Sequence, residues 1–85
     1  MSLTSDEIRA HVVQLLKTTA PNAAEISGST QIVQDLGLDS LAVMNLMLAL
    51  EDHYDISIPL DRVAEIVAVD DLIEAVVSLT KAERV

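Results

Sequence analysis

The sequence predicts an all-α protein, a four-helix bundle with three longer helices and one short helix. Apolar residues make up 51% of the chain, yet Tyr54 is its only aromatic residue, so aliphatic side chains must build the core. Two glycines and two prolines in 85 residues leave room for long helices, and apolar residues recur at helical spacing. A chain of this length predicts one domain, residues 1–85, with a modest core and no room for a deep active site.

The first long helix is predicted within LTSDEIRAHVVQLLKTTAP, residues 3–21. Thr4 followed by Glu7 matches a capping box, in which two side chains satisfy backbone N–H groups at a helix start. Pro21 ends the helix. The apolar residues between them follow the spacing of one buried stripe, which comprises Ile8, Val12, Leu15 and Leu16.

A long connection is predicted between this helix and the next. Residues 22–30, NAAEISGST, form a loop with a flexible glycine at Gly28. Residues 30–38, TQIVQDLGL, have apolar residues without long periodicity, so we expect these to pin the connection to the core. They are Ile32, Val33, Leu36 and Leu38. A loop of this length inside a small domain tends to be functional.

The second long helix is predicted from Ser40 to about His53, with Asp39 as its N-cap. A step of about 100° per residue places apolar residues on two opposite faces. The larger face is assigned to the core and comprises Val43, Leu46, Met47, Leu50 and Tyr54.

The smaller apolar face of this helix, called the docking stripe below, comprises Leu41, Met44 and Leu48. Asn45 and Asp52 flank it, and such polar residues are expected to be solvated. The alternative is a central helix that is buried all round. The flanking polar residues and the small size of the bundle favour an outward-facing stripe that binds a partner.

Two further helices complete the predicted bundle. Pro59 is expected to begin a short helix that ends near Ile66. Asp70 and Asp71 open the last long helix. Its apolar side comprises Leu72, Ile73, Val76, Val77 and Leu79.

Charge and composition exclude several functions. Residues 29–66 contain one basic and seven acidic residues, a net charge of −6 out of −9 for the whole chain. This surface repels phosphate backbones, and one aromatic residue offers little base stacking, so we expect no nucleic-acid partner. A basic protein partner fits better, because complementary charge speeds encounter. The alternative is that the acidity only keeps the protein soluble.

Location and metal chemistry are bounded in the same way. No run of about 18 apolar residues could span a membrane, and the acidic start MSLTSDEIRA differs from a signal peptide, so a cytoplasmic protein is expected. Without cysteine there is no disulfide, thiolate ligand or cysteine nucleophile. Residues 51–62, EDHYDISIPLDR, end in Arg62 and lack the central glycine of a calcium loop. We therefore predict no metal site.

Ser40 has no visible base that would make it an enzyme nucleophile. His53 lies 13 residues further along the same helix, roughly 20 Å away, and His11 is better explained as a packed or partly exposed side chain. Residues 37–41, GLDSL, differ from the G-x-S-x-G motif, so an autonomous esterase is excluded and no catalytic residue is predicted. A helix N-terminus suits an attached phosphate, although position alone favours a capping serine without further role.

Residues 35–41, DLGLDSL, resemble the Asp-Leu-Gly-x-Asp-Ser-Leu signature of acyl carrier proteins. Residues 48–59, LALEDHYDISIP, are similar to the family's Leu-x-x-Glu-x-x-(Phe/Tyr)-x-Ile-x-(Ile/Phe)-Pro pattern, and the helix layout matches over about residues 5–80. The resemblance implies a non-catalytic carrier with 4′-phosphopantetheine attached to Ser40 through a phosphodiester. The thiol of that group would hold an acyl, aminoacyl or polyketide cargo as a thioester. The alternative is an acidic helical interaction module without a prosthetic group.

The resemblance also implies roles for further residues. Asp39 would orient the site and help the modifying transferase, Gly37 would let the backbone turn before the helix, and Asp35 would support the loop or a partner contact. The implied partners are a phosphopantetheinyl transferase, a loading ligase or transferase, and synthase enzymes with basic and apolar patches. A monomer is expected. The expected partner-binding residues are Leu41, Met44, Asn45, Leu48, Asp52, Asp61 and Glu65.

The chain departs from the family pattern on the second helix. Members that serve fatty acid synthesis usually have acidic residues where this chain has Ala42, Asn45 and His53. Recognition is therefore expected to depend on the docking stripe with Asp61 and Glu65, in a specialised pathway. The Asp before Ser40 is more similar to acyl carriers than to peptidyl carriers, which usually have Gly-Gly-(His/Asp)-Ser. Because the chain ends soon after the last helix, we expect a freestanding carrier; the cargo stays open.

Overall fold

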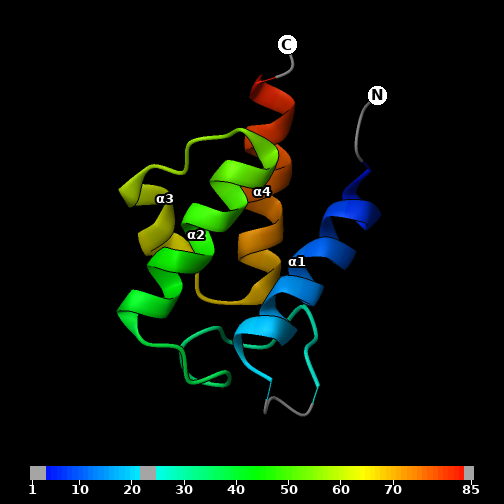
Figure 1. Cartoon of the computed structure of the whole chain (residues 1–85). Helices are drawn as coiled ribbons and strands as arrows, with labels where there is room; N and C mark the ends of the chain where they lie inside the picture. Colours follow the sequence, from blue (N-terminus) through cyan, green and yellow to red (C-terminus); the bar gives the residue numbers. More distant parts are fainter. Residues whose placement is uncertain (1–3, 22–24, 84–85) are drawn as a thin grey trace.

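The computed structural model of the chain describes residues 4–21 and 25–83, with side chains as far as residue 80. The described part contains α1 (Ser5–Thr19), α2 (Ser40–Tyr54), α3 (Leu60–Glu65) and α4 (Val69–Glu83), as Figure 1 shows. Across those residues no strand forms, and the only β-pairing is an isolated bridge between Gln31 and Ala68. The predicted class, three long helices and one short one, is confirmed.

Helix α1 begins with the predicted capping box. The Thr4 hydroxyl accepts from the Glu7 backbone N–H at 3.2 Å, and the Glu7 carboxylate accepts from the Thr4 N–H at 3.2 Å. The helix ends at Thr19, two residues before Pro21, which agrees with the predicted stop. Helix α1 contacts both α4 and α2. Its fully buried side chains are Ile8, Val12 and Leu16, while Leu15 is partly buried.

The connection between α1 and α2 is pinned to the start of α4 by backbone hydrogen bonds. The Ile32 N–H donates to the Val67 carbonyl, the Val69 N–H to the Thr30 carbonyl, and the Asp70 N–H to the Gly28 carbonyl, each at 2.9 Å. At Gly28 the backbone comes so close to Asp70 that a Cβ atom would collide with its carboxylate oxygens. The same carboxylate pairs with Arg9 of α1 at 3.0 Å, so three segments meet there.

The apolar residues of this connection divide into anchors and one exposed side chain. Ile32 and Leu38 are buried and Leu36 packs against the core, as predicted. The prediction for Val33 is wrong, because its side chain is 59% exposed. The reason is a turn over residues 32–36, in which the Gly37 N–H bonds to the Val33 carbonyl at 3.0 Å. Since Ile32 points into the core, its neighbour in this turn points outward.

Helix α2 has the two predicted apolar faces. Leu46, Met47 and Leu50 are buried, and Val43 and Tyr54 pack against the core with partial exposure. The opposite docking stripe is exposed, at 71% for Leu41, 44% for Met44 and 58% for Leu48. The alternative of a helix buried all round is therefore excluded.

Helices α3 and α4 begin one residue away from their predicted starts. Pro59 precedes α3 as its N-cap, in an extended conformation with ψ 152°, and its carbonyl accepts from the N–H groups of Arg62 and Val63. Helix α4 begins at Val69, before Asp70, and the Asp71 carboxylate accepts from the N–H groups of Val67 and Ala68 at 3.1 and 2.9 Å. Those two bonds hold the pKa of Asp71 below its usual value.

The variants Leu50→Ala and Leu48→Ala compare the two faces of α2. Leu50 is fully buried, so its truncation leaves a cavity and should lower the free energy of unfolding by about 2–5 kcal/mol. Leu48 lies on the docking stripe, and its truncation should change that free energy by less than about 0.5 kcal/mol. Urea unfolding followed by circular dichroism measures both, and equal losses would show that the stripe is packed.

Candidate functional site

Ser40 is the first residue of α2, and its side chain is exposed. The predicted N-cap, Asp39, accepts from the Ala42 N–H with its side chain at 2.8 Å and from the Val43 N–H with its carbonyl at 3.0 Å. The first N–H groups of a helix have no partner within the helix. Among the hydrogen bonds of the described residues there is no acceptor for the N–H groups of Ser40 and Leu41, which leaves both available beside the serine.

The loop before Ser40 is shaped by Gly37 and Asp35. Gly37 has a φ of 69°, in the left-handed region that favours glycine, so the predicted backbone turn before the helix is present. No atom lies within 4 Å of the position that a Cβ would take there, so the turn borders open space. The Asp35 carboxylate accepts from the Gln31 N–H at 2.8 Å, which supports the loop. Buried Leu38 then anchors the chain directly before Asp39.

These surroundings fit a phosphodiester on Ser40. The serine is exposed, the backbone beside Gly37 is open, and two N–H groups that have no acceptor among the described residues lie beside the serine at the positive end of a 15-residue helix, an arrangement that suits an anion. A hollow of about 430 Å³ also lies beside Gly37, between the end of α1 and residues 34–38. The exposed Ser40 is therefore accessible to a bulky group.

Neither histidine serves Ser40 as a base. His11 and His53 lie against each other and against Tyr54, which is the last residue of α2, whereas Ser40 is the first. The prediction of a partly packed His11 is confirmed, since its ring is half-buried. With both histidines engaged at the far end of the helix, the exclusion of an autonomous esterase stands on geometry as well as on sequence.

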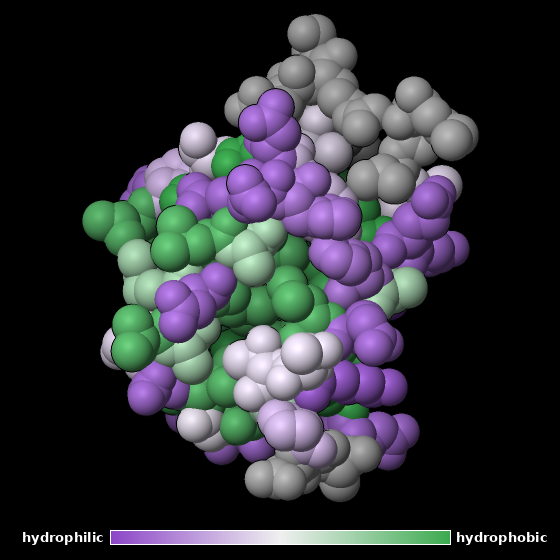
Figure 2. All heavy atoms as spheres, viewed as in Figure 1, coloured by the Kyte–Doolittle hydropathy of each residue, from purple (hydrophilic) through white to green (hydrophobic). Residues whose placement is uncertain are grey.

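The residues predicted to contact partners are all exposed. The docking stripe lies on the outer side of α2, and Asn45 and Asp52 of the same helix are exposed, as are Asp61 and Glu65 of α3. Figure 2 shows hydrophobic atoms gathered over α2 and α3, whereas hydrophilic atoms line the side where α1 lies. The surface of α2 and α3 thus combines exposed apolar residues with a partial acidic border.

Two features of this surface escaped the sequence reasoning. Leu60, at the start of α3, is 74% exposed, and Val67 after α3 is also exposed. A six-residue helix is too short for periodicity to distinguish an exposed face from a buried one. The position of Leu60 directly after Pro59, at the start of the helix, was the only sign that its side chain would be exposed. The Glu51 carboxylate, near the end of α2, accepts from the Ile58 N–H at 2.8 Å and so holds the loop after α2.

Comparisons with known proteins agree with this geometry. Residues 6–76 match the family model described as a phosphopantetheine attachment site. This chain belongs to that family. A probable acyl carrier protein of Caulobacter vibrioides is 50% identical over 50 residues, which cover 59% of this chain and 58% of the relative. The mitochondrial acyl carrier protein of Saccharomyces cerevisiae is 41% identical over 69 residues, covering 75% and 54%.

Other relatives extend the match. The acyl carrier protein of Campylobacter hominis is 36% identical over 76 residues, covering 89% of this chain and 92% of the relative. The chain thus spans just over half of the first two relatives and nearly all of the third. The solution structure of the acetyl actinorhodin acyl carrier protein from Streptomyces coelicolor superposes with a TM-score of 0.65 at 26% identity, covering 98% and 95% of the two chains. The chain is an acyl carrier domain, and carrier domains of this family are in general not enzymes.

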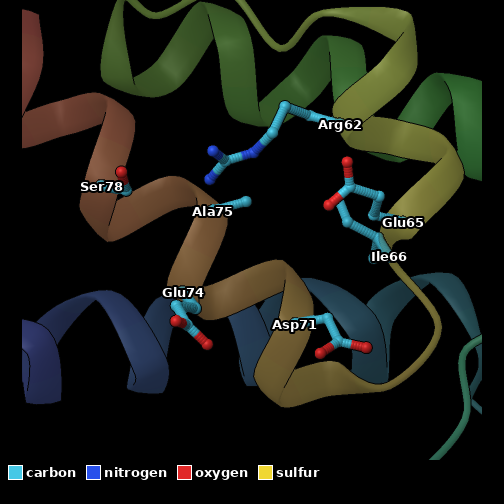
Figure 3. Close-up of a pocket in the computed structure, with 7 residues that line it drawn as sticks. All are labelled: Arg62, Glu65, Ile66, Asp71, Glu74, Ala75 and Ser78. Atoms are coloured by element: carbon cyan, nitrogen blue, oxygen red, sulfur yellow. The ribbon is translucent and has the colours of Figure 1, made fainter.

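A second hollow of the carrier domain, about 330 Å³, lies between α3 and α4. Figure 3 shows the guanidinium of Arg62 reaching towards Ala75 and Ser78, with the Glu65 carboxylate pointing into the same space. Asp71 and Glu74 also line it, so one cation stands against three carboxylates, a balance that disfavours a phosphate. Within residues 4–21 and 25–80, no group of three or more potential ligands could hold a metal ion, and no described helix is long and apolar enough to cross a bilayer.

The variants Asp39→Ala and Asp39→Asn test the cap beside Ser40. Alanine removes the acceptor of the Ala42 N–H and should lower the free energy of unfolding by about 1 kcal/mol. Asparagine keeps a capping oxygen and should cost no more than roughly a few tenths of a kcal/mol. Urea unfolding compares the two variants, and an equal loss in both would mean that the charge of Asp39, not its hydrogen bond, stabilises the start of α2.

Proposed function

We propose that Ser40 is the attachment point of 4′-phosphopantetheine and that this chain carries acyl intermediates to partner enzymes. The observation that carries the proposal is the exposed Ser40 at the start of α2, inside the DLGLDSL signature of a chain whose family is defined by phosphopantetheine attachment. When bound, the group supplies a terminal thiol that holds the cargo as a thioester. A chain without cysteine has no thiol of its own.

The residues around Ser40 would position the attached phosphate. Its negative charge would be stabilised by the N–H groups of Ser40 and Leu41 and by the positive end of the α2 dipole. Asp39 and Gly37 hold the turn that keeps the serine exposed. Because both histidines are engaged elsewhere, the base that takes the serine proton would come from a phosphopantetheinyl transferase.

The docking stripe is proposed as the surface that partner enzymes contact. Leu41, Met44 and Leu48 offer exposed apolar area next to Ser40, and Leu60 extends it onto α3. Asp52, Asp61 and Glu65 would steer basic patches towards it, with Asn45 as a polar contact. The partners proposed are the transferase, a loading ligase or transferase, and synthase enzymes. A monomer in the cytoplasm fits this role.

A specialised pathway is favoured over primary fatty acid synthesis. The first turn of α2 contains no acidic residue, and Ala42 and Asn45 stand where carriers of fatty acid synthesis usually have carboxylates. Apolar contact would therefore contribute more to partner binding here, and long-range charge less. An acyl cargo is favoured over an amino acid by Asp39 before the serine, and the structural likeness to the acetyl actinorhodin acyl carrier protein is compatible with that.

Ser40→Ala should abolish loading. Wild-type protein incubated with coenzyme A and a broad-specificity phosphopantetheinyl transferase should gain one phosphopantetheine in intact-mass analysis, whereas Ser40→Ala should gain none and keep its helical spectrum. Ser57→Ala, at an exposed loop serine, is the matched control and should be modified normally. No loading of the wild type while a control carrier is modified would leave the unmodified interaction module as the better explanation. Loading of Ser40→Ala would show that the group attaches at another residue and would overturn the assignment of Ser40.

Leu41→Asp and Met44→Asp should slow the same modification without unfolding the protein. Each variant places a charge in the proposed contact, and a loss of roughly tenfold in transferase kcat/KM is expected for a central contact residue. Gln14→Asp introduces the same charge on the exposed side of α1 and should leave the rate unchanged. An equal transferase kcat/KM for all three variants would show that the transferase does not bind the docking stripe.

A further inference from the structure

Three ring side chains join α1 to the carboxyl end of α2. His11 of α1 stacks on His53 of α2 with ring centroids 4.1 Å apart and an interplanar angle of 28°. The Nδ1 atom of His11 lies 2.8 Å from the Tyr54 hydroxyl, and both histidines meet the Tyr54 ring edge-on, at 5.5 and 4.7 Å. These are the only two histidines in the chain, so every imidazole of the protein lies in this cluster.

The geometry suits neutral rings and opposes two charged ones. Burial, and secondly the neighbouring His53, lower the pKa of His11 below its ordinary value of 6.5. Burial raises the pKa of Tyr54, so its hydroxyl keeps a proton that it can donate to Nδ1 of a neutral His11. A second proton on His11 removes that acceptor lone pair and, when His53 is charged as well, sets two cations face to face.

The charges around the cluster do not neutralise such a pair. In the described part of the chain no imidazole lies within ion-pair distance of a carboxylate, and Arg9 is engaged with Asp70. Glu7 lies one helical turn before His11, Asp52 directly precedes His53, and Asp55 caps the end of α2. None of these three carboxylates forms an ion pair with either ring. The last turn of α4 contributes Lys81 and Glu83, whose side chains lie outside the described residues. His53 lies in the last turn of α2, with its ring stacked directly on that of His11.

We propose that His11, His53 and Tyr54 form a pH-sensitive contact that holds α1 against the carboxyl end of α2 and weakens on acidification. A folded state whose His11 has a lowered pKa binds fewer protons than the unfolded chain. The stabilisation is then complete above the ordinary pKa of 6.5 and is lost progressively as the pH falls below it. The inference does not rest on the proposed function, because Ser40 lies at the opposite end of α2.

Thermal unfolding of the full chain tests this between about pH 7.5 and 5.5, a range above the ordinary carboxyl pKa values. Across this range the Tm of the wild type should fall by roughly 4 °C more than the Tm of His53→Phe. The phenylalanine keeps a stacking ring but cannot take a proton. The comparison is made in about 0.5 M salt, which screens the attraction of the net charge of −9 for protons on any histidine. Parallel profiles of the two proteins would overturn the proposal.

Imidazole NMR titration gives a second readout on the same proteins. The His11 ring in the wild type should titrate below its ordinary pKa, and this pKa should rise in His53→Phe because the neighbouring charge is gone. His53→Gln is the second variant should the phenylalanine disturb folding, since the His53 side chain is exposed. An ordinary His11 pKa in the wild type, or one that does not move when His53 is replaced, would refute a coupled pair.

Discussion

The structure depends on the attachment of the long connection between α1 and α2 to the start of α4. Backbone bonds from Val69 and Asp70 to the loop, and from Ile32 back to Val67, fix a segment that forms no helix or strand in its described residues 20–21 and 25–39. Ordering such a segment costs conformational entropy, which the burial of Ile32 and Leu38 offsets. Leu38 is anchored directly before Asp39, at the end of this fixed segment. The position of Ser40 therefore depends on the contacts that the segment makes with the start of α4. The site is thereby held on a rigid frame, although every residue that would touch the phosphate is exposed.

Helix α2 serves the core and the surface at once, and this constrains its sequence. One face supplies Leu46, Met47 and Leu50 to the interior, while the docking stripe exposes leucines and a methionine to solvent. Exposed apolar area of this kind favours association with other proteins, including unwanted ones. The strong negative charge of residues 29–66 opposes contact between copies of the chain, yet leaves basic partners free to approach. Acidity and the apolar stripe are therefore complementary parts of one surface rather than separate features.

The parts of this structure that were predicted from the sequence are those encoded locally. The Thr4–Glu7 capping box, the Asp39 cap and the two faces of α2 follow from spacing over a few residues, and the structure has all three. Periodicity does not report the features that were missed. The exposure of Val33 depends on a turn, the exposure of Leu60 on a short helix, and the role of Glu51 on a contact with the loop after α2. The pairing of His11 with Tyr54 spans 43 residues and arises only when α1 packs on α2. Ser40 itself was ambiguous by position, and the family signature gave it a role that helix geometry alone did not.

The two ends of α2 have different roles: the amino end presents Ser40, and the carboxyl end packs against α1. At the amino end two N–H groups stay open beside Ser40, whereas at the carboxyl end Asp55, with a φ of 55°, closes the helix and the Ile56 N–H bonds to the Glu51 carbonyl at 3.1 Å. The helix dipole stabilises an anion at the first end and a cation at the second. A phosphate on Ser40 would lie beside open N–H groups as well as the Asp39 carboxylate. Protons on both His53 and His11 would instead set two cations face to face, with ring centroids 4.1 Å apart. Acidification would therefore act on the packing of α1 against α2, through a contact 13 to 14 residues along α2 from the serine, while the hydrogen bonds that position Ser40 keep their partners.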